Sequence, residues 1–141
     1  HSTGEPPDPM SEATFNDSRL QWELVENEPH KNMLRYYKEL IALRKSFPAL
    51  YELDRKQLYC EEDVDAQTIL LRRSFADQHL ICLMNFSDQS RAMLTLAYEE
   101  GWKKVFDSAD ARWGGMSQAP LAVEPGMEVT VQPESILIYK N

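Results

Sequence analysis

The hydrophobic positions along the chain change their spacing once, near Pro48. Before that point, residues 30–47 place apolar side chains with the period of an α-helix, and Pro29 and Pro48 bound the pattern. On a helical wheel these side chains cover an arc of about 180°, wider than the stripe of about 100° that is typical of a surface helix. The pattern therefore predicts a helix that packs against two neighbours.

After Pro48 the apolar segments are short, rich in β-branched and aromatic residues, and separated by turn residues. They predict eight strands, over residues 57–61, 68–75, 79–86, 91–96, 102–107, 121–123, 128–131 and 135–139. Turns are expected at residues 76–78, 87–89, 99–101, 125–126 and 133–134. Because no helical segment separates these strands, we predict a mainly β fold: an antiparallel Greek-key β-sandwich preceded by one long α-helix and an extended N-terminal segment.

The extended segment covers residues 1–28, where several prolines leave room for a single helical turn around residues 16–20. The chain begins at His1 without an initiator Met, so we expect a piece of a longer polypeptide. A long helix before an all-β domain is explained if the helix is the last element of a preceding domain.

The composition of the chain argues against several classes of function. The chain has 141 residues, the size of one domain, with 15 Lys and Arg against 23 Asp and Glu, for a net charge of −8. This acidic balance argues against nucleic acid as a partner, and no apolar run is long enough to cross a membrane. Cys60 and Cys82 lie in strand-like segments, which favours free thiols in a cytoplasmic protein. The three histidines and two cysteines show no metal-ligand spacing, so no metal and no cofactor are predicted.

Four segments carry a resemblance to known proteins. Residues 34–50 (LRYYKELIALRKSFPAL) resemble the final barrel helix of the α-amylase superfamily of glycoside hydrolases. Residues 7–22 (PDPMSEATFNDSRLQW), 106–115 (FDSADARWGG) and 133–139 (PESILIY) are similar to segments of malto-oligosyltrehalose trehalohydrolases. Met10-Ser11 and Arg19 depart from the pattern of those enzymes, which leaves a glucan-branching enzyme or an α-glucosidase open as the parent.

The resemblance implies a parent enzyme that uses paired carboxylates to release trehalose from a malto-oligosaccharide derivative. Its catalytic carboxylates would lie on barrel strands upstream of this chain, so no catalytic residue is expected here. Residues 1–47 are then the lead-in and last helix of a missing (β/α)8 catalytic barrel, and residues 48–141 are a C-terminal β-sandwich domain. Its expected role is to stabilise that barrel, its partner in the same polypeptide; without the barrel, the exposed helix flank would favour self-association.

A few residues are candidates for specific contacts. Arg44 falls within the apolar arc of the predicted helix, so we expect a structural ion pair. Aromatic rings stack on sugar faces, which makes Trp22, together with Arg19, and Trp113 candidate carbohydrate contacts; packing of these rings is the alternative. A starch- or maltodextrin-binding module is therefore a rival function, with malto-oligosaccharide as its ligand.

A small independent enzyme is a further rival, and it would need two carboxylates that flank a glycosidic bond. Asp107 and Asp110 are the candidate pair. Asp residues at a strand end more often bind the local backbone, so we predict a turn role for both.

Overall fold

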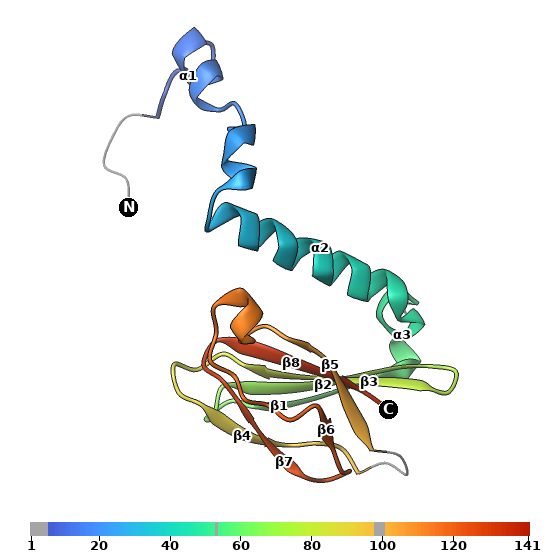
Figure 1. The fold of residues 1–141 in the computed structure, drawn as a ribbon. Helices are drawn as coiled ribbons and strands as arrows, with labels where there is room; N and C mark the ends of the chain where they lie inside the picture. Colours follow the sequence, from blue (N-terminus) through green and yellow to red (C-terminus); the bar gives the residue numbers. More distant parts are fainter. Residues whose placement is uncertain (1–5, 53, 98–100) are drawn as a thin grey trace. The chain divides into compact units, whose positions relative to one another are not determined.

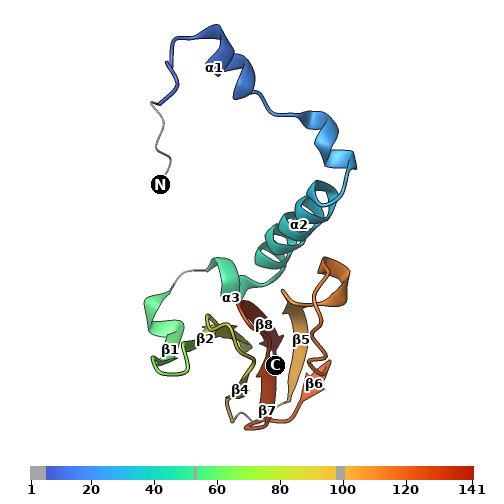
Figure 2. The ribbon, with the colours of Figure 1, turned by 90° about the vertical axis from the view of Figure 1, so that its left-hand side faces the viewer.

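The structure is a computed structural model that describes residues 6–52, 54–97 and 101–141. The chain divides between Arg35 and Tyr36 into two compact units, and the division falls inside helix α2 (His30–Ser46). Figures 1 and 2 show the ribbon in two orientations. The N-terminal unit is described from residue 6 to Arg35, and the C-terminal unit covers residues 36–141.

The N-terminal unit contains more helix than its prolines predict. Helix α1 (Glu12–Asp17) is followed by the 3-10 helix η1 (Trp22–Glu26) and by the first residues of α2. Ser11 caps α1, because its hydroxyl accepts a hydrogen bond from the Ala13 N–H at 3.2 Å. The expected single turn at residues 16–20 is therefore wrong in position: the helix begins at Glu12, after the Ser11 cap, and thus four residues earlier than predicted.

The C-terminal unit holds all eight predicted strands, with ends that differ from the prediction by two residues or fewer. They are β1 (Leu58–Asp63), β2 (Thr68–Phe75), β3 (Gln78–Asn85), β4 (Arg91–Leu94), β5 (Trp102–Asp107), β6 (Ala122–Val123), β7 (Glu128–Val131) and β8 (Ser135–Lys140). The predicted turn at residues 99–101 lies mostly outside the described residues.

The strands form two antiparallel sheets. A six-stranded sheet has the order β1-β2-β3-β8-β5-β6, and β4 pairs with β7 in a second sheet. The second sheet covers one face of the larger sheet, and α3 (Pro48–Tyr51) lies on the other side (Figures 1 and 2). The predicted mainly β class is confirmed.

Alternation of side chains gives the larger sheet two apolar faces. The face toward β4 and β7 holds the core of the sandwich: Leu70, Ile81, Leu83, Met93, Trp102, Val129, Val131, Leu137 and Tyr139. On the opposite face a second cluster contains Leu80, Cys82, Phe106 and Ile138 of the sheet and Ala49 of α3, and partly buried side chains that include Tyr36, Leu40 and Leu43 of α2 and Phe47 pack against it. One side of α2 thus packs on the sheet within the C-terminal unit and is partly buried there.

Helix α3 was not predicted, because Pro48 reads as a stop signal. Phe47 leaves the helical conformation, and Pro48 then occupies the start of α3, where a missing N–H costs nothing. Ala49 is fully buried, and its N–H donates to the side-chain oxygen of Gln78 at 3.1 Å. The same proline therefore ends one helix and begins the next. The 3-10 helix η2 (Arg55–Gln57) leads from there to β1.

Burial of Cys82 is expected to make the sandwich less stable at alkaline pH. Burial raises the pKa of the Cys82 thiol from its ordinary value of 9.0 to about 11, and Arg73 opposes this shift. The unfolded chain loses the thiol proton first, so this contribution to stability is complete below pH 9 and is lost as pH rises to 11. A rise of the thiol pKa from 9.0 to about 11 corresponds to a loss of about 2–3 kcal/mol in the free energy of unfolding once the pH has passed 11.

We therefore expect the free energy of unfolding of wild type to fall more steeply between pH 9 and 11 than that of C82A. Urea unfolding across this pH range measures the free energy of unfolding of both proteins. Titrating groups that the two proteins share cancel in the difference between them. C60A changes an exposed thiol and is the matched control. Parallel curves for wild type and C82A would contradict the expectation.

Candidate functional site

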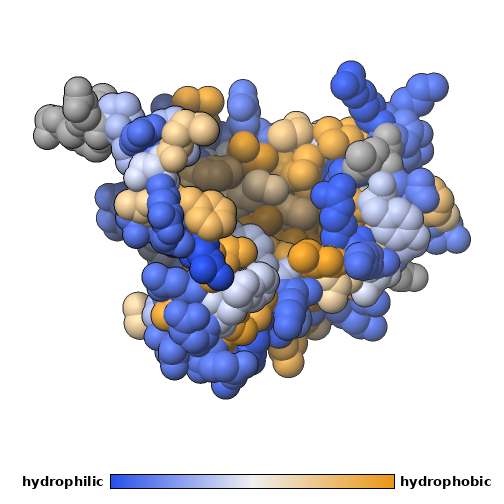
Figure 3. Space-filling model, turned by 90° about the horizontal axis from the view of Figure 1, so that it is seen from above, coloured by the Kyte–Doolittle hydropathy of each residue, from blue (hydrophilic) through white to orange (hydrophobic). Residues whose placement is uncertain are grey.

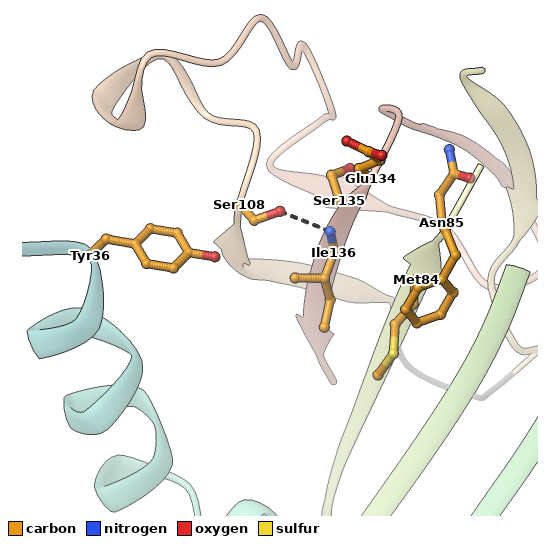
Figure 4. A pocket seen from close by; sticks show the side chains of 8 residues that line it. Tyr36, Met84, Asn85, Ser108, Glu134, Ser135 and Ile136 are labelled. Atoms are coloured by element: carbon orange, nitrogen blue, oxygen red, sulfur yellow. Dashed lines mark hydrogen bonds between the residues drawn. The ribbon is translucent and has the colours of Figure 1, made fainter. Parts of the chain in front are cut away.

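A pocket of about 510 Å³ opens at one end of the six-stranded sheet, beside α2. Its size is within the range of about 300–1,000 Å³ that is usual for ligand pockets. Its lining combines apolar and polar side chains (Figure 4): Tyr36, Met84, Asn85, Phe86, Ser108, Glu134, Ser135 and Ile136. All eight residues belong to the C-terminal unit.

The apolar wall follows from strand register. Met84 at the end of β3 and Ile136 at the start of β8 are cross-strand partners, so their side chains share a face of the sheet. Phe86 follows β3 and is 59% exposed. The pocket therefore has an apolar wall that the C-terminal unit does not cover.

The polar wall of the pocket is formed by residues of α2 and of the segment that follows β5. Tyr36 extends from α2 toward Ser108, whose hydroxyl accepts a hydrogen bond from the Ile136 N–H at 2.8 Å (Figure 4). Partial burial raises the pKa of Tyr36 more than its hydrogen bond with Ser108 lowers it. The phenol therefore stays neutral at physiological pH and can donate or accept a hydrogen bond.

Buried Asn85 is one of the residues that line the pocket. Its side-chain nitrogen lies within hydrogen-bond distance of three carbonyl oxygens, those of Gln89 (2.7 Å), Gln132 (2.9 Å) and Val131 (3.2 Å), which share its two N–H groups. Its oxygen accepts from the N–H and the hydroxyl of Ser87 at 3.0 and 2.8 Å. One side chain thus joins the turn after β3 to the end of β7. Sequence reasoning missed this residue, because an Asn at a strand end is most often a turn residue.

The candidate pair Asp107 and Asp110 lies at the start of the loop after β5. A carboxylate oxygen of Asp107 accepts the Ala109 N–H at 2.9 Å, and one of Asp110 accepts the Arg112 N–H at 2.9 Å, capping the 3-10 helix η3 (Ala111–Trp113). Asp107 is 2% exposed and lies 3.6 Å from the ammonium of Lys104. The structure thus gives both carboxylates the local backbone partners that their position after a strand predicts.

Trp113 is packed within the C-terminal unit. Its ring meets that of Tyr36 edge to face at 5.3 Å, and the guanidinium of Arg112 lies over the ring at 4.6 Å from the centroid. Arg112 also pairs with Glu39 on α2 at 3.1 Å. These contacts tie the loop to α2, and the cation occupies a ring face that a sugar would need. The carbohydrate contact of Trp113 stays a prediction, and the geometry favours anchoring.

Arg19 and Trp22 belong to the N-terminal unit. Both are exposed, and Trp22 begins η1 with 73% of its surface accessible. Trp113 lies in the C-terminal unit. A role of Arg19 and Trp22 in carbohydrate binding stays a prediction.

The side of α2 that faces away from the sheet exposes hydrophobic side chains. Tyr37 and Ile41 on α2 and Tyr51 on α3 are 57%, 54% and 44% exposed. Ile41, Tyr51 and the stems of Arg44 and Lys45 line an apolar notch of about 430 Å³. Figure 3 shows hydrophobic and hydrophilic side chains side by side on one face of the molecule. We call this area the helix flank: Tyr37, Ile41, Arg44, Lys45 and Tyr51.

Arg44 lies within the helix flank and is exposed. Over the residues that the structure describes, no carboxylate forms an ion pair with it. Its guanidinium reaches water past an apolar stem, as long cationic side chains do at an apolar surface. The ion pair expected for Arg44 stays a prediction.

In the described ranges, no group of three or more His, Cys, Asp or Glu side chains could hold a metal ion. No helix there has the length and hydrophobicity needed to cross a membrane.

Known proteins resemble this chain in sequence over most of its length. The 1,4-α-glucan branching enzyme of Synechococcus sp. is 26% identical over 86% of this chain and 18% of its own length. That of Oceanobacillus iheyensis is 33% identical over 70% of this chain and 17% of its own length. The malto-oligosyltrehalose trehalohydrolase of Deinococcus radiodurans is 32% identical over 62% of this chain and 14% of its own length. No family model matches the chain.

Solved structures share the fold. The α-amylase from H. orenii superposes with a TM-score of 0.62 at 17% identity, over 94% of this chain and 25% of the amylase. The trehalulose synthase MutB from Pseudomonas mesoacidophila gives 0.56 at 21% identity, over 75% of this chain and 17% of the synthase.

Sequence and fold together identify the chain as a C-terminal region of an α-amylase-family glycoside hydrolase. It spans only 17–18% of the length of the two branching enzymes described above. The region is therefore one domain of a larger polypeptide.

Proposed function

We propose that this chain is the C-terminal accessory domain of a 1,4-α-glucan branching enzyme, in which it stabilises the catalytic barrel of the same polypeptide. Matches to branching enzymes extend over as much as 86% of the chain, whereas the trehalohydrolase match extends over 62%. The parent expected from sequence, a trehalohydrolase, is thereby less well supported than its branching-enzyme alternative. A trehalohydrolase stays the second candidate for the parent, because the matched segment of the Deinococcus radiodurans enzyme is 32% identical to this chain.

The helix flank is the observation that carries the stabilising role. A helix that buries one side on a sheet and exposes Tyr37 and Ile41 on the other has an apolar surface without a cover in the C-terminal unit. Burial of roughly 200 Å² there would contribute about 5 kcal/mol as an upper estimate. Arg44 and Lys45 border this surface, so the partner that fits it is apolar with a carboxylate at its rim. The ion pair predicted for Arg44 would then be made with the barrel.

Ile41→Glu tests the stabilising role when it is made both in the parent polypeptide and in the 141-residue chain. In the parent we expect a loss of about 2–3 kcal/mol, because a carboxylate would be buried where an isoleucine side chain packs. In the chain alone Ile41 is exposed, so the same substitution is expected to change stability by less than about 0.5 kcal/mol. Urea unfolding measures both.

Two variants control this comparison. Ile41→Leu keeps an apolar side chain on the flank, and Lys38→Glu adds a carboxylate at another exposed position of α2; both are expected to be near neutral in the parent. Equal effects of Ile41→Glu in the parent and in the chain alone would remove the docking role. Concentration-dependent association of the chain that Ile41→Glu abolishes would show a second copy on the flank instead.

Activity of the parent polypeptide separates the two candidate enzymes. A branching enzyme is expected to introduce branches into amylose, which a fall in iodine staining and the appearance of α-1,6 linkages report. A trehalohydrolase is expected instead to release trehalose from maltosyltrehalose. The 141-residue chain by itself is expected to do neither. A cytoplasmic location is retained as part of the proposal, since Cys60 and Cys82 are both free thiols.

A further inference from the structure

We propose that a second copy of this chain pairs with the free edge of β1, antiparallel and about a two-fold axis at Tyr59. β1 is the outermost strand of the six-stranded sheet, and within the described residues β2 is its only partner strand. Figure 2 shows β1 at the margin of that sheet, next to β2. The strand at the opposite margin, β6, has two residues and is too short to serve as a template. This inference goes beyond the proposed function, because it does not depend on which enzyme the parent is.

Both faces of β1 are open to solvent. All six residues of the strand are exposed, although a strand in a sandwich normally buries every second side chain. Leu58 and Tyr59 are 44% and 41% exposed, and Cys60 beside them is an exposed free thiol. The centre of this edge is therefore uncharged and partly apolar, a composition that favours pairing with a further strand.

Charges of opposite sign lie at the two ends of the edge. Arg55 and Lys56 precede the strand in η2, and Glu61, Glu62 and Asp63 follow its uncharged centre. All five residues are exposed, and over the part of the chain that the structure describes none of them forms an ion pair. Antiparallel pairing places the start of one strand against the end of the other. The basic end of each copy therefore meets the acidic end of the other copy.

The charges select one register. With Tyr59 on the two-fold axis, Lys56 comes opposite Glu62 of the second copy, and Arg55 comes opposite Asp63 of the second copy. The symmetry repeats both contacts on the other side of the axis. A 3-10 helix rises by about 2.0 Å per residue and a strand by about 3.3 Å, and the long side chains of Arg55 and Lys56 span this difference.

Other registers of this edge pair the charges less well. An axis at Cys60 moves Lys56 from Glu62 to a position opposite Val64. An axis at Glu61 places this carboxylate opposite its own copy, and like charges directly opposite each other destabilise a sheet. The register about Tyr59 is therefore the one in which the acidic and basic ends match.

Tyr59 is positioned for a contact across the axis. Its hydroxyl donates to a carboxylate oxygen of Glu61 at 2.9 Å, and the guanidinium of Arg72 lies over its ring, 5.6 Å from the centroid. These two contacts hold the ring on one face of the sheet. In the dimer the two copies of Tyr59 lie opposite each other on that face, where aromatic pairs stabilise strand pairing.

Charged side chains on an edge strand can also serve to prevent pairing, which is the alternative explanation of this edge. An edge with charges of one sign repels a second copy of itself in every register. Here the sign of the charge changes along the edge, so two antiparallel copies attract each other at both ends. The pattern therefore favours a second copy over protection of the edge.

The test measures the association of the 141-residue chain by analytical ultracentrifugation. Every protein in the series carries Ile41→Glu, which removes the helix flank as a surface for self-association. We expect a weak dimer, with a Kd of about 10–1,000 μM, because the contact is limited to one edge strand and its flanking residues. The dimer is expected to weaken as added salt screens the paired charges.

Exchange of charges tests the register. Lys56→Glu and Glu62→Lys each place like charges opposite each other on both sides of the axis, and each is expected to raise the Kd about ten-fold. An equimolar mixture of the two variants, and the double variant, restore opposite charges and are expected to associate as tightly as the protein without these exchanges. Lys103→Glu on β5 and Glu128→Lys on β7 make the same changes at exposed positions of other strands and are the matched controls.

Four results would overturn the proposal. One is a chain that stays monomeric at about 1 mM, because the charges would then protect the edge. Two others are a dimer that both single exchanges leave unchanged and a mixture that associates no better than the single variants. The last is a loss of stability on Lys56→Glu that is confined to the parent polypeptide, because it would show that another part of the parent occupies this edge.

Discussion

Replacement of Asn85 by aspartate is expected to destabilise the sandwich by about 3–5 kcal/mol, one of the two largest effects among the substitutions considered. The two N–H groups of the wild-type amide are shared among three backbone carbonyls, and the side chain is 1% exposed. A carboxylate has no proton to donate, so the three carbonyl oxygens would lose a donor and would face a negative charge in a site without water. Asn85→Ala is expected to cost a similar amount, because it removes the donor and leaves a cavity.

Urea unfolding of the 141-residue chain measures the Asn85 effect. Ser90→Ala is the control: Ser90 is exposed in the same turn, its hydroxyl makes a long contact of 3.5 Å with Gln132, and the substitution is expected to change stability by less than about 0.5 kcal/mol. A loss below about 1 kcal/mol for Asn85→Asp would show that water reaches the three carbonyls. The inference that Asn85 holds the turn after β3 to the end of β7 would then be wrong.

The second large effect is expected for Trp102→Ala, at about 3–5 kcal/mol. Trp102 has no accessible surface and packs between the two sheets, and its indole N–H donates to the Leu96 carbonyl at 2.8 Å. Alanine leaves a large cavity and a carbonyl without its donor. Trp102→Phe keeps most of the packing and is expected to cost about half as much.

Trp22→Ala is the matched control for Trp102→Ala, because it removes the same side chain from a site that is 73% exposed in the N-terminal unit. We expect it to leave the free energy of unfolding of the sandwich unchanged within about 0.5 kcal/mol. Chemical denaturation followed by far-ultraviolet circular dichroism measures both variants. Similar losses for Trp22→Ala and Trp102→Ala would mean that the N-terminal unit and the sandwich unfold together.

The candidate residues illustrate where sequence reasoning stops. Trp113 is an aromatic residue in a Gly-containing loop, which makes it a candidate for stacking on a sugar. In the structure, however, the guanidinium of Arg112 lies over its ring and the ring of Tyr36 packs edge to face against it. Phe86, which the pattern assigns to the end of a strand, is instead an exposed wall of the pocket. A pattern along the chain cannot show which aromatic ring another element covers, because that element is distant in sequence.

The parent enzyme shows a similar limit. Residues 34–50 and 106–115 resemble segments of one superfamily, and the comparisons support that superfamily. Departures at Met10-Ser11 and Arg19 left a branching enzyme open, and the broader matches favour it. Segments that fold a shared C-terminal sandwich carry little information on the chemistry of a distant barrel, since fold and function are set by different residues.

The local pattern of this chain determined the strands, the long helix and the mainly β class, because side-chain period and turn residues act over a few neighbours. It also determined that α2 would be apolar over half its surface. Only the tertiary structure decided which side of α2 packs on the sheet, how Asn85 joins the turn after β3 to the end of β7, and that Tyr36, Ser108, Glu134 and Ile136 line one pocket. Such groupings depend on strand order, and strand order arises from packing between residues far apart in sequence.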